Sequence, residues 1–142
     1  MTRDGFALAA TIILLVPMFY FAMSSLTFLL VRLDVPTVTR LLRGLFNAYF
    51  LIVGISGIIG TIAFTVDGRP AIAVAFGCIT AFAVWARRWF LQQMDTQISA
   101  RDAGDGHAVR RLRYLHWGGM ACNAAQLAVV LYAIPYVTIT PT

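Results

Sequence analysis

Polar side chains follow one face of the last apolar segment of this chain. Arg113, His116, Met120 and Asn123 are spaced three or four residues apart, and Gln126 lies slightly off their line. On a helix, such spacing places side chains on one face. Imidazole and amide groups in an apolar environment need protein or water as partners, so we expect this face to point into a helix bundle.

Two uses of this face are open. In the first, His116 binds haem iron or a metal, with Met120 or a group of another helix as the second ligand, or the face binds a quinone or an aromatic substrate. In the second, His116 bonds a carbonyl or a phosphate group, while Asn123 and Gln126 form hydrogen bonds between helices. We adopt the second as the simpler interpretation. A haem held by two histidines of one chain is not expected, because His107 lies about two and a half helical turns before His116.

Few other residues carry a chemical signature. Asn47 is expected inside the bundle, bonded to a neighbouring helix and close enough in depth to contact Asn123 or His116. Asp102, Asp105 and His107 fall in a glycine-broken polar segment, for which a solvated turn is a simpler interpretation than a metal site with oxygen and nitrogen ligands. The apolar segments contain no paired carboxylates, and the chain has no zinc, phosphate-loop or dinucleotide motif. The sequence therefore predicts no catalytic residue, no metal and no particular cofactor.

The elements that must position these groups are four long apolar runs. Each is near or above the roughly 20 residues that a helix needs to cross a bilayer. We expect an all-α, integral membrane four-helix bundle formed by one domain over residues 1–142. The runs cover residues 6–31, 45–66, 70–91 and 115–138.

Arginine is distributed unevenly among the connections between these runs. All eleven cationic residues are arginines. Arg87 and Arg88 lie near the end of the third run, and of the others only Arg3 and Arg69 lie outside the connections that follow the first and third runs. By the positive-inside rule, the connections 32–44 and 92–114 should be cytoplasmic and both termini outside the cytoplasm. The arginines expected at the lipid headgroups are Arg40, Arg43, Arg87, Arg88, Arg110 and Arg111.

The same distribution bears on the cellular location. A net charge of +5 is accounted for by contact with anionic headgroups, so nucleic acid is not expected as a partner. The absence of lysine and glutamate is typical of a GC-rich bacterial genome. We therefore expect a multi-pass protein of the bacterial inner (plasma) membrane.

Small residues predict how the second and third helices pack. The turn 66–70 is short, so these helices should be antiparallel neighbours. Small residues let membrane helices approach closely, and we expect those of the two helices to face each other. The residues concerned are Gly54, Ser56, Gly57 and Gly60 on the second helix, and Ala73, Gly77 and Ala81 on the third.

The polar connection after the third run should be partly helical. Leu91, Met94 and Ile98 keep helical spacing among polar neighbours, so the third helix should extend beyond the membrane. Asp105 should then cap the fourth helix.

The segment from Arg110 to Leu127 resembles the last helix of a group of small bacterial membrane proteins. That group has four spans and is related in outline to the anthrone-oxygenase-like proteins, with an Arg-x-x-His start and an Asn further along the same helix face. The resemblance implies a four-helix fold and makes Arg113, His116 and Asn123 the matching residues. It implies no particular activity. The first run lacks the histidine of copper-resistance-D-like haem-binding families, so the resemblance does not extend to them.

We expect the chain to be a non-enzymatic accessory or scaffolding subunit of a larger membrane assembly, or to self-associate. The small-residue faces exceed what four helices need, and we expect both tails to be ordered against a partner. The alternative is a small redox or ligand-binding protein that uses the His116 face. A channel or transporter is disfavoured because ionisable residues are scarce within the apolar runs.

Overall fold

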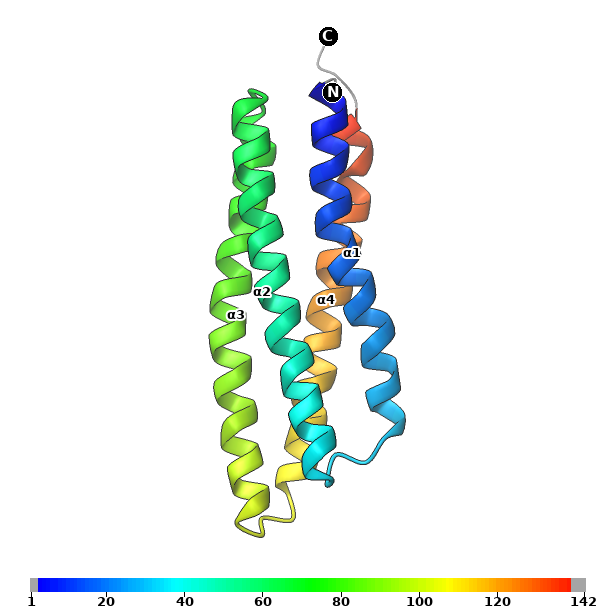
Figure 1. Ribbon diagram of the computed structural model, residues 1–142, viewed down its shortest axis with the longest axis vertical. Helices are drawn as coiled ribbons and strands as arrows, with labels where there is room; N and C mark the ends of the chain where they lie inside the picture. The colour runs from blue at the N-terminus through cyan, green and yellow to red at the C-terminus, as the bar shows by residue number, and fades with distance from the viewer. Residues whose placement is uncertain (1–2, 139–142) are drawn as a thin grey trace.

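The computed structural model describes residues 3–138, and every element in that range is a helix (Figure 1). The helices are α1 (Arg3–Leu30), α2 (Pro36–Val66), α3 (Pro70–Asp102) and α4 (Ala108–Thr138). All four are long and apolar enough to cross a membrane. The all-α fold with four candidate spans is therefore confirmed. The expected order of the two tails concerns residues 1–2 and 139–142, which lie outside the described residues.

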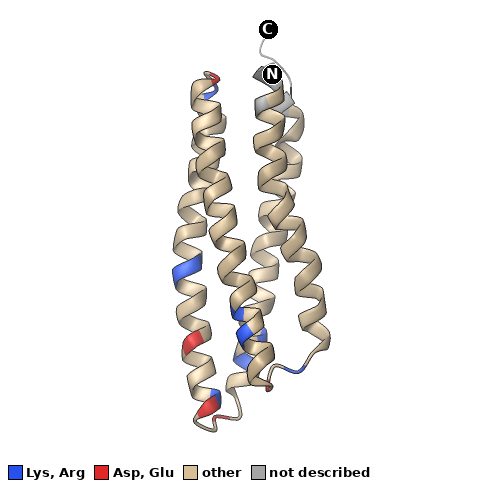
Figure 2. Ribbon diagram, in the orientation of Figure 1, with Lys and Arg blue, Asp and Glu red and all other residues tan. Residues whose placement is uncertain are grey.

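The helices form a four-membered bundle in which chain neighbours are also spatial neighbours. Each of α1 and α3 packs against both α2 and α4, and the contact between α2 and α3 is the most extensive. The α1–α2 and α3–α4 connections lie at one end, and the α2–α3 turn lies at the other (Figure 1). Most charged residues are at the first of these ends, which we call the arginine-rich end (Figure 2).

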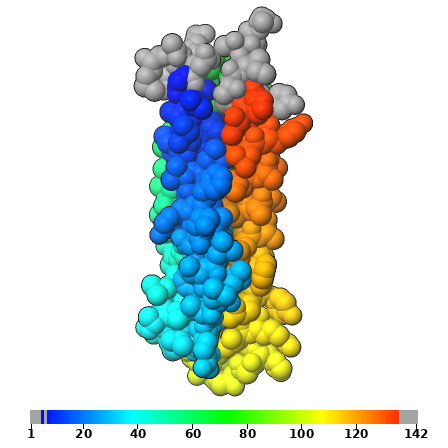
Figure 3. Space-filling model, turned by 90° about the vertical axis from the view of Figure 1, so that its right-hand side faces the viewer, coloured from blue at the N-terminus to red at the C-terminus, as the bar shows by residue number. Residues whose placement is uncertain are grey.

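The α1 and α4 helices make up one long face of the bundle. They lie side by side along this face from one end to the other (Figure 3). The polar residues of α4 described below contact both α1 and α2.

Proline and glycine fix the helix ends. Pro36 and Pro70 occupy the first turns of α2 and α3, where the missing N–H would have no partner in the helix. Gly68 and Gly104 adopt left-handed φ angles of 74° and 93° directly after α2 and α3. Residues with a Cβ rarely adopt this conformation, so glycine is what lets the chain reverse there.

Two further expectations about the polar connections are confirmed. The α3 helix continues to Asp102, well past the apolar run. The carboxylate of Asp105 accepts the backbone N–H of His107 at 2.8 Å, while its backbone oxygen accepts that of Ala108 at 3.1 Å. Asp105 thus caps the start of α4.

The glycines of α2 let α3 approach closely. A Cβ built on Gly57 would lie 2.2 Å from Oγ1 of Thr80, and one built on Gly60 would lie 2.0 Å from Cδ1 of Phe76. Gly54 is less crowded, since its Cβ would be 4.0 Å from that of Ala83. Close approach of α2 and α3 therefore depends on Gly57 and Gly60.

On α3, the row in contact with α2 differs from the predicted one. Ala73 is buried, but Gly77 is only half-buried and Ala81 is exposed, and Phe76 and Ala83 are buried instead. Steps of four residues drift around a helix by about 40° each, because one turn takes 3.6 residues. Alternating steps of three and four stay on one face, which is why the contact follows Phe76 and Ala83.

Ser56 faces a different neighbour from the glycines of its helix. Its hydroxyl donates to the backbone oxygen of Ile13 at 3.3 Å, so it joins α2 to α1.

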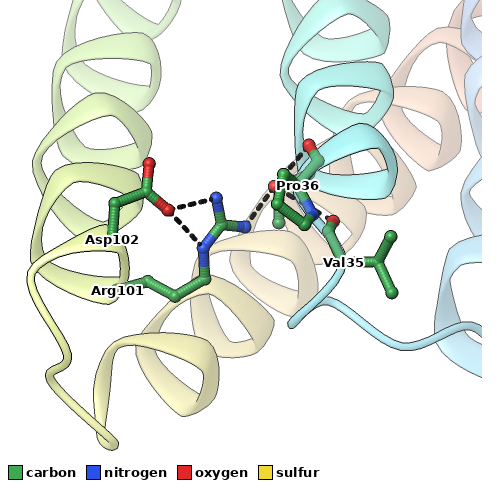
Figure 4. Close-up of polar contacts among 5 residues, drawn as sticks. Val35, Pro36, Arg101 and Asp102 are labelled. Atoms are coloured by element: carbon green, nitrogen blue, oxygen red, sulfur yellow. Dashed lines mark hydrogen bonds and ion pairs between the residues drawn. The ribbon is translucent and has the colours of Figure 1, made fainter.

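Side chains of α2 and α3 also meet at the arginine-rich end. Arg101 donates to Oδ1 of Asp102, at 3.0 Å from Nε and 2.7 Å from Nη2, and also donates to the hydroxyl of Thr39 (Figure 4). The Thr39 hydroxyl in turn donates to the backbone oxygen of Pro36 at 3.0 Å. These contacts hold the end of α3 against the start of α2.

Candidate functional site

An aromatic layer fills the half of the bundle nearer the arginine-rich end. The ring of Phe46 on α2 lies 5.1 Å from Phe21 of α1 and 5.4 Å from Phe90 of α3, measured between ring centroids. Tyr49 stacks on Phe21 at 4.2 Å. Phe21 and Phe46 are fully buried. The layer therefore joins three helices and leaves its remaining side to α4.

On one side of this layer, amides of α4 bond across the bundle. Tyr49 Oη lies 2.8 Å from Asn123 Oδ1 and 3.1 Å from Gln126 Oε1. A phenol has one proton to donate, so one amide must instead offer its NH2 group to the phenol oxygen. Asn123 also donates to the backbone oxygen of Met18 at 3.2 Å. Asn123 and Gln126 thus join α4 to α2, and Asn123 also joins it to α1.

His116 lies on the other side of the layer and is fully buried. Its ring meets Phe28 of α1 and Phe46 of α2 edge-on, with centroid distances of 6.2 and 6.3 Å. Neither Nδ1 nor Nε2 has a hydrogen-bond partner among the described residues. An imidazole has at least one donor and, when neutral, one acceptor, so its burial without partners is costly.

Ser25 on α1 is a second buried group without a partner. Its side chain is fully buried, and Oγ makes no hydrogen bond within the described part of the chain. The hydroxyl of Thr11, in contrast, donates to the oxygen of Ala7 one turn earlier on the same helix, at 2.9 Å. Sequence reasoning missed Ser25, although it continues the buried series of Leu14, Met18 and Phe21 on α1.

The buried face of α4 runs through Gly119 rather than Met120. A Cβ on Gly119 would lie 2.3 Å from Cε1 of Phe46, so the aromatic ring occupies the space of the missing side chain. Met120 is half-buried beside this face. The sequence interpretation placed Met120 in line with His116 and Asn123, but the helix turns Gly119 to the centre.

Arg113 is bound to the end of α1. Its guanidinium donates to the backbone oxygens of Leu29 and Val31, at 3.1 Å each. These carbonyls lie at the C-terminus of α1, where the helix provides no N–H partner and a cation is favoured. Arg113 therefore stabilises the helix end that faces His116.

Asn47 lies apart from the polar groups of α4. Its Oδ1 accepts a hydrogen bond from Nε of Arg87 at 3.0 Å, so it joins α2 to α3. Contact with Asn123 or His116 was predicted from depth alone, but residue 47 faces another neighbour. Tyr49, two residues later, takes the place in the network.

The predicted headgroup arginines fall into two groups. Arg43 donates to both carboxylate oxygens of Asp95, and Arg111 donates to Asp105 Oδ2 at 3.1 Å. With Arg87 on Asn47, these three have protein partners. Arg40, Arg88 and Arg110 are exposed and have no partner among residues 3–138, so they can reach phosphate groups.

The polar residues offer no ready place for a metal or a haem. Among the described residues, no group of three His, Cys, Asp or Glu side chains lies close enough together to hold a metal ion. Phe28 and Phe46 flank His116, so a macrocycle beside its ring would have to displace them. Only a much smaller group fits next to His116 without repacking the bundle.

Comparisons with protein-family models, curated proteins and solved structures found no match. The resemblance of α4 to the anthrone-oxygenase-like group therefore stays a prediction.

Proposed function

We propose that this chain is a non-enzymatic accessory or scaffolding subunit of a larger membrane assembly. We also propose that it resides in the inner membrane of a bacterium, with the arginine-rich end in the cytoplasm. The positive-inside rule supports this orientation, because nine of the eleven arginines are near that end.

The proposal rests on a small-residue groove on the outside of the α2–α3 pair. The groove has a volume of about 480 Å³ and is lined by Thr61, Val74, Gly77, Cys78 and Ala81, among others. A Cβ on Gly77 would be 3.9 Å from Oγ1 of Thr61, so the packing of α3 against α2 does not require a glycine at position 77. Membrane helices associate through such small-residue surfaces, and this one is in excess of what the bundle uses.

Filling the groove tests the proposal. Ala81 is exposed, so Ala81→Leu should leave the bundle intact while blocking a helix that packs on the groove. Ala125 is also exposed but lies on α4, and Ala125→Leu is the matched control. Tagged chains would be isolated from native membranes in mild detergent, and co-purifying proteins identified by mass spectrometry.

We expect a stoichiometric partner, or a second copy, with the wild type and Ala125→Leu but not with Ala81→Leu. Cys78 lines the groove as an exposed free thiol, so a cysteine-directed cross-linker should join it to the same partner. Isolation of the wild-type chain as a monomer without cross-links would contradict the proposal.

A second candidate function is ligand binding at His116. The observation in its favour is the pair of buried ring nitrogens without partners among the described residues. A haem or a large aromatic substrate would displace Phe28 and Phe46, so a compact ligand or the polar end of a quinone fits this candidate better. A chromophore or quinone retained on purification and lost in His116→Ala would support it, and its absence from the wild type would count against these ligands.

A further inference from the structure

We propose that Ser25 and His116 together form a binding site for one compact, neutral molecule that both donates and accepts hydrogen bonds. The site lies between α1 and α4 at the aromatic layer. This inference develops the second candidate function and does not depend on the subunit role.

The pairing of α1 with α4 places these two residues at the same level. Asn123 bonds the oxygen of Met18, and Arg113 bonds that of Leu29, so the two helices run antiparallel. Moving seven residues from Asn123 toward Arg113 leads to His116, and moving seven from Met18 toward Leu29 leads to Ser25. Seven residues are about two helical turns, so both steps return to the facing side.

Ring contacts support the same placement. Phe28, three residues after Ser25, touches the His116 ring, while Phe21, four residues before Ser25, touches Phe46. Phe46 itself touches His116. Ser25 therefore sits on the α1 face whose aromatic neighbours surround the imidazole.

The two side chains present three polar atoms without a partner. Ser25 Oγ, His116 Nδ1 and His116 Nε2 are all buried and unbonded within the described structure. The Ser25 hydroxyl does not bond its own helix as that of Thr11 does, and so remains available to a ligand. The two ring nitrogens point away from each other, so a molecule between the helices would meet one of them, as an N–H or a lone pair, together with the hydroxyl group of Ser25, which both donates and accepts.

The surroundings favour a neutral ligand. The guanidinium of Arg113, one turn away on α4, disfavours a cation. The four carboxylates in the described part of the arginine-rich end cannot offset one, because each is paired with an arginine. These are Asp34, Asp95, Asp102 and Asp105. An anion would lose its hydration among Phe21, Phe28 and Phe46, and the guanidinium of Arg113 directs two of its N–H groups to the oxygens of Leu29 and Val31.

The closed packing sets the size of the ligand. Ser25 and His116 have no exposed surface, and the ring of Phe46 fills the space at Gly119. A water molecule is the smallest ligand that both donates and accepts, and the hydroxyl end of a lipid-soluble molecule inserted between α1 and α4 offers the same chemistry.

A double-mutant cycle tests whether the two residues share a ligand. Ser25→Ala and His116→Leu would be made singly and together, and the folding equilibrium measured in mixed micelles. Each single variant leaves a hydrogen-bonding group of the ligand, and the other side chain, without a partner. The double variant removes both hydrogen-bonding side chains, so no protein group is left unpaired. We expect the combined effect to be smaller than the product of the single effects by about fivefold or more. Agreement with the product within about twofold would overturn the proposal.

Nitrogen NMR of the histidines separates a ligand from a direct Ser25–His116 bond and needs only the folded wild type. His107 is exposed, so His107→Asn removes the other histidine signal without touching the core. We expect one ring nitrogen of His116 at a hydrogen-bonded shift. Magnetisation transfer from water would identify water as the ligand, and a retained organic molecule, absent from the double variant, would identify the other source.

Two unbonded ring nitrogens, or a bond to Ser25 with no ligand contact, would overturn the proposal. Neither result would affect the partner isolated through the Cys78 groove, so the failure of this site and that of the subunit role are distinguishable.

Discussion

The glycine pair of α4 provides the sharpest prediction about the bundle core. Gly118 and Gly119 are adjacent in sequence but face different surroundings. A Cβ on Gly119 would lie 2.3 and 2.4 Å from Cε1 and Cζ of Phe46, while one on Gly118 would lie 4.0 Å from the same atoms of Phe90. Carbon atoms in favourable contact are about 3.5–4.0 Å apart, so only Gly119→Ala forces a ring to move by more than about 1 Å.

Phe46 has little freedom to move. Its ring is fully buried and is held by Phe21 at 5.1 Å and Phe90 at 5.4 Å between centroids. Overpacking of this kind costs about 1–3 kcal/mol, and the better helix propensity of alanine offsets up to about 1 kcal/mol. We therefore expect Gly119→Ala to lower the free energy of unfolding by about 1–2 kcal/mol.

Gly118→Ala serves as the matched control. It gains the same propensity without the clash, so its stability should be unchanged or raised by up to about 1 kcal/mol. Both variants would be unfolded with SDS in mixed micelles and followed by circular dichroism. Phe46→Leu should recover part of the loss in Gly119→Ala by making room. Equal effects of the two alanines would refute the assigned rotation of α4, and with it the burial of His116.

Three further outcomes are expected. Tyr49→Phe should lower the free energy of unfolding by about 1 kcal/mol, because the amide of Asn123 loses its phenol partner; in the Asn123→Ala background, a second loss of the same size would contradict the pairing. The pKa of Asp105 is lowered from 3.8, first by the backbone N–H of His107 and then by Arg111, so the ionised carboxylate stabilises the fold. This contribution should be complete above about pH 4 and should vanish as the pH falls further, which thermal unfolding of wild type and Asp105→Ala across pH would measure. A stability difference between the two proteins that grew on acidification would contradict this sign. The pair of Arg43 with the half-exposed Asp95 should give a coupling of only about 0.2–1 kcal/mol in a double-mutant cycle, and a larger, salt-insensitive value would contradict its surface character.

The fold could be predicted from local features of the sequence. The length of the apolar runs predicted four spanning helices, and the segments at Gly68 and Gly104 predicted where the chain reverses. The antiparallel pairing of α2 with α3 followed from the short turn between them. Which row of α3 meets the glycines of α2 did not follow, because it depends on the rotation of two helices against each other. Phe76 fills the space at Gly60, and a pattern of small residues does not predict that a phenylalanine makes this contact.

The candidate site was predicted only in part, because it too depends on how the helices are rotated against each other. Spacing alone placed His116 and Asn123 on one buried face of α4. Ser25 was missed because a serine on a helix can bond its own backbone, and only the register of α1 against α4 reveals that it faces His116. Asn47 was preferred to Tyr49 as the deep polar group, but residues two apart point in very different directions on a helix.

The central claim is that the chain crosses the membrane four times with its arginine-rich end in the cytoplasm, and side-specific cysteine labelling tests it most directly. In a background with Cys78 and Cys122 replaced by alanine, Val66→Cys would report on the α2–α3 turn and Gly106→Cys on the α3–α4 connection. Val66 is 81% exposed, and a Cβ on Gly106 would meet no atom within 4 Å, so both sites accept the change. A membrane-impermeant maleimide should label residue 66 on intact spheroplasts and residue 106 only after permeabilisation. Labelling of both residues from the same side would contradict the account.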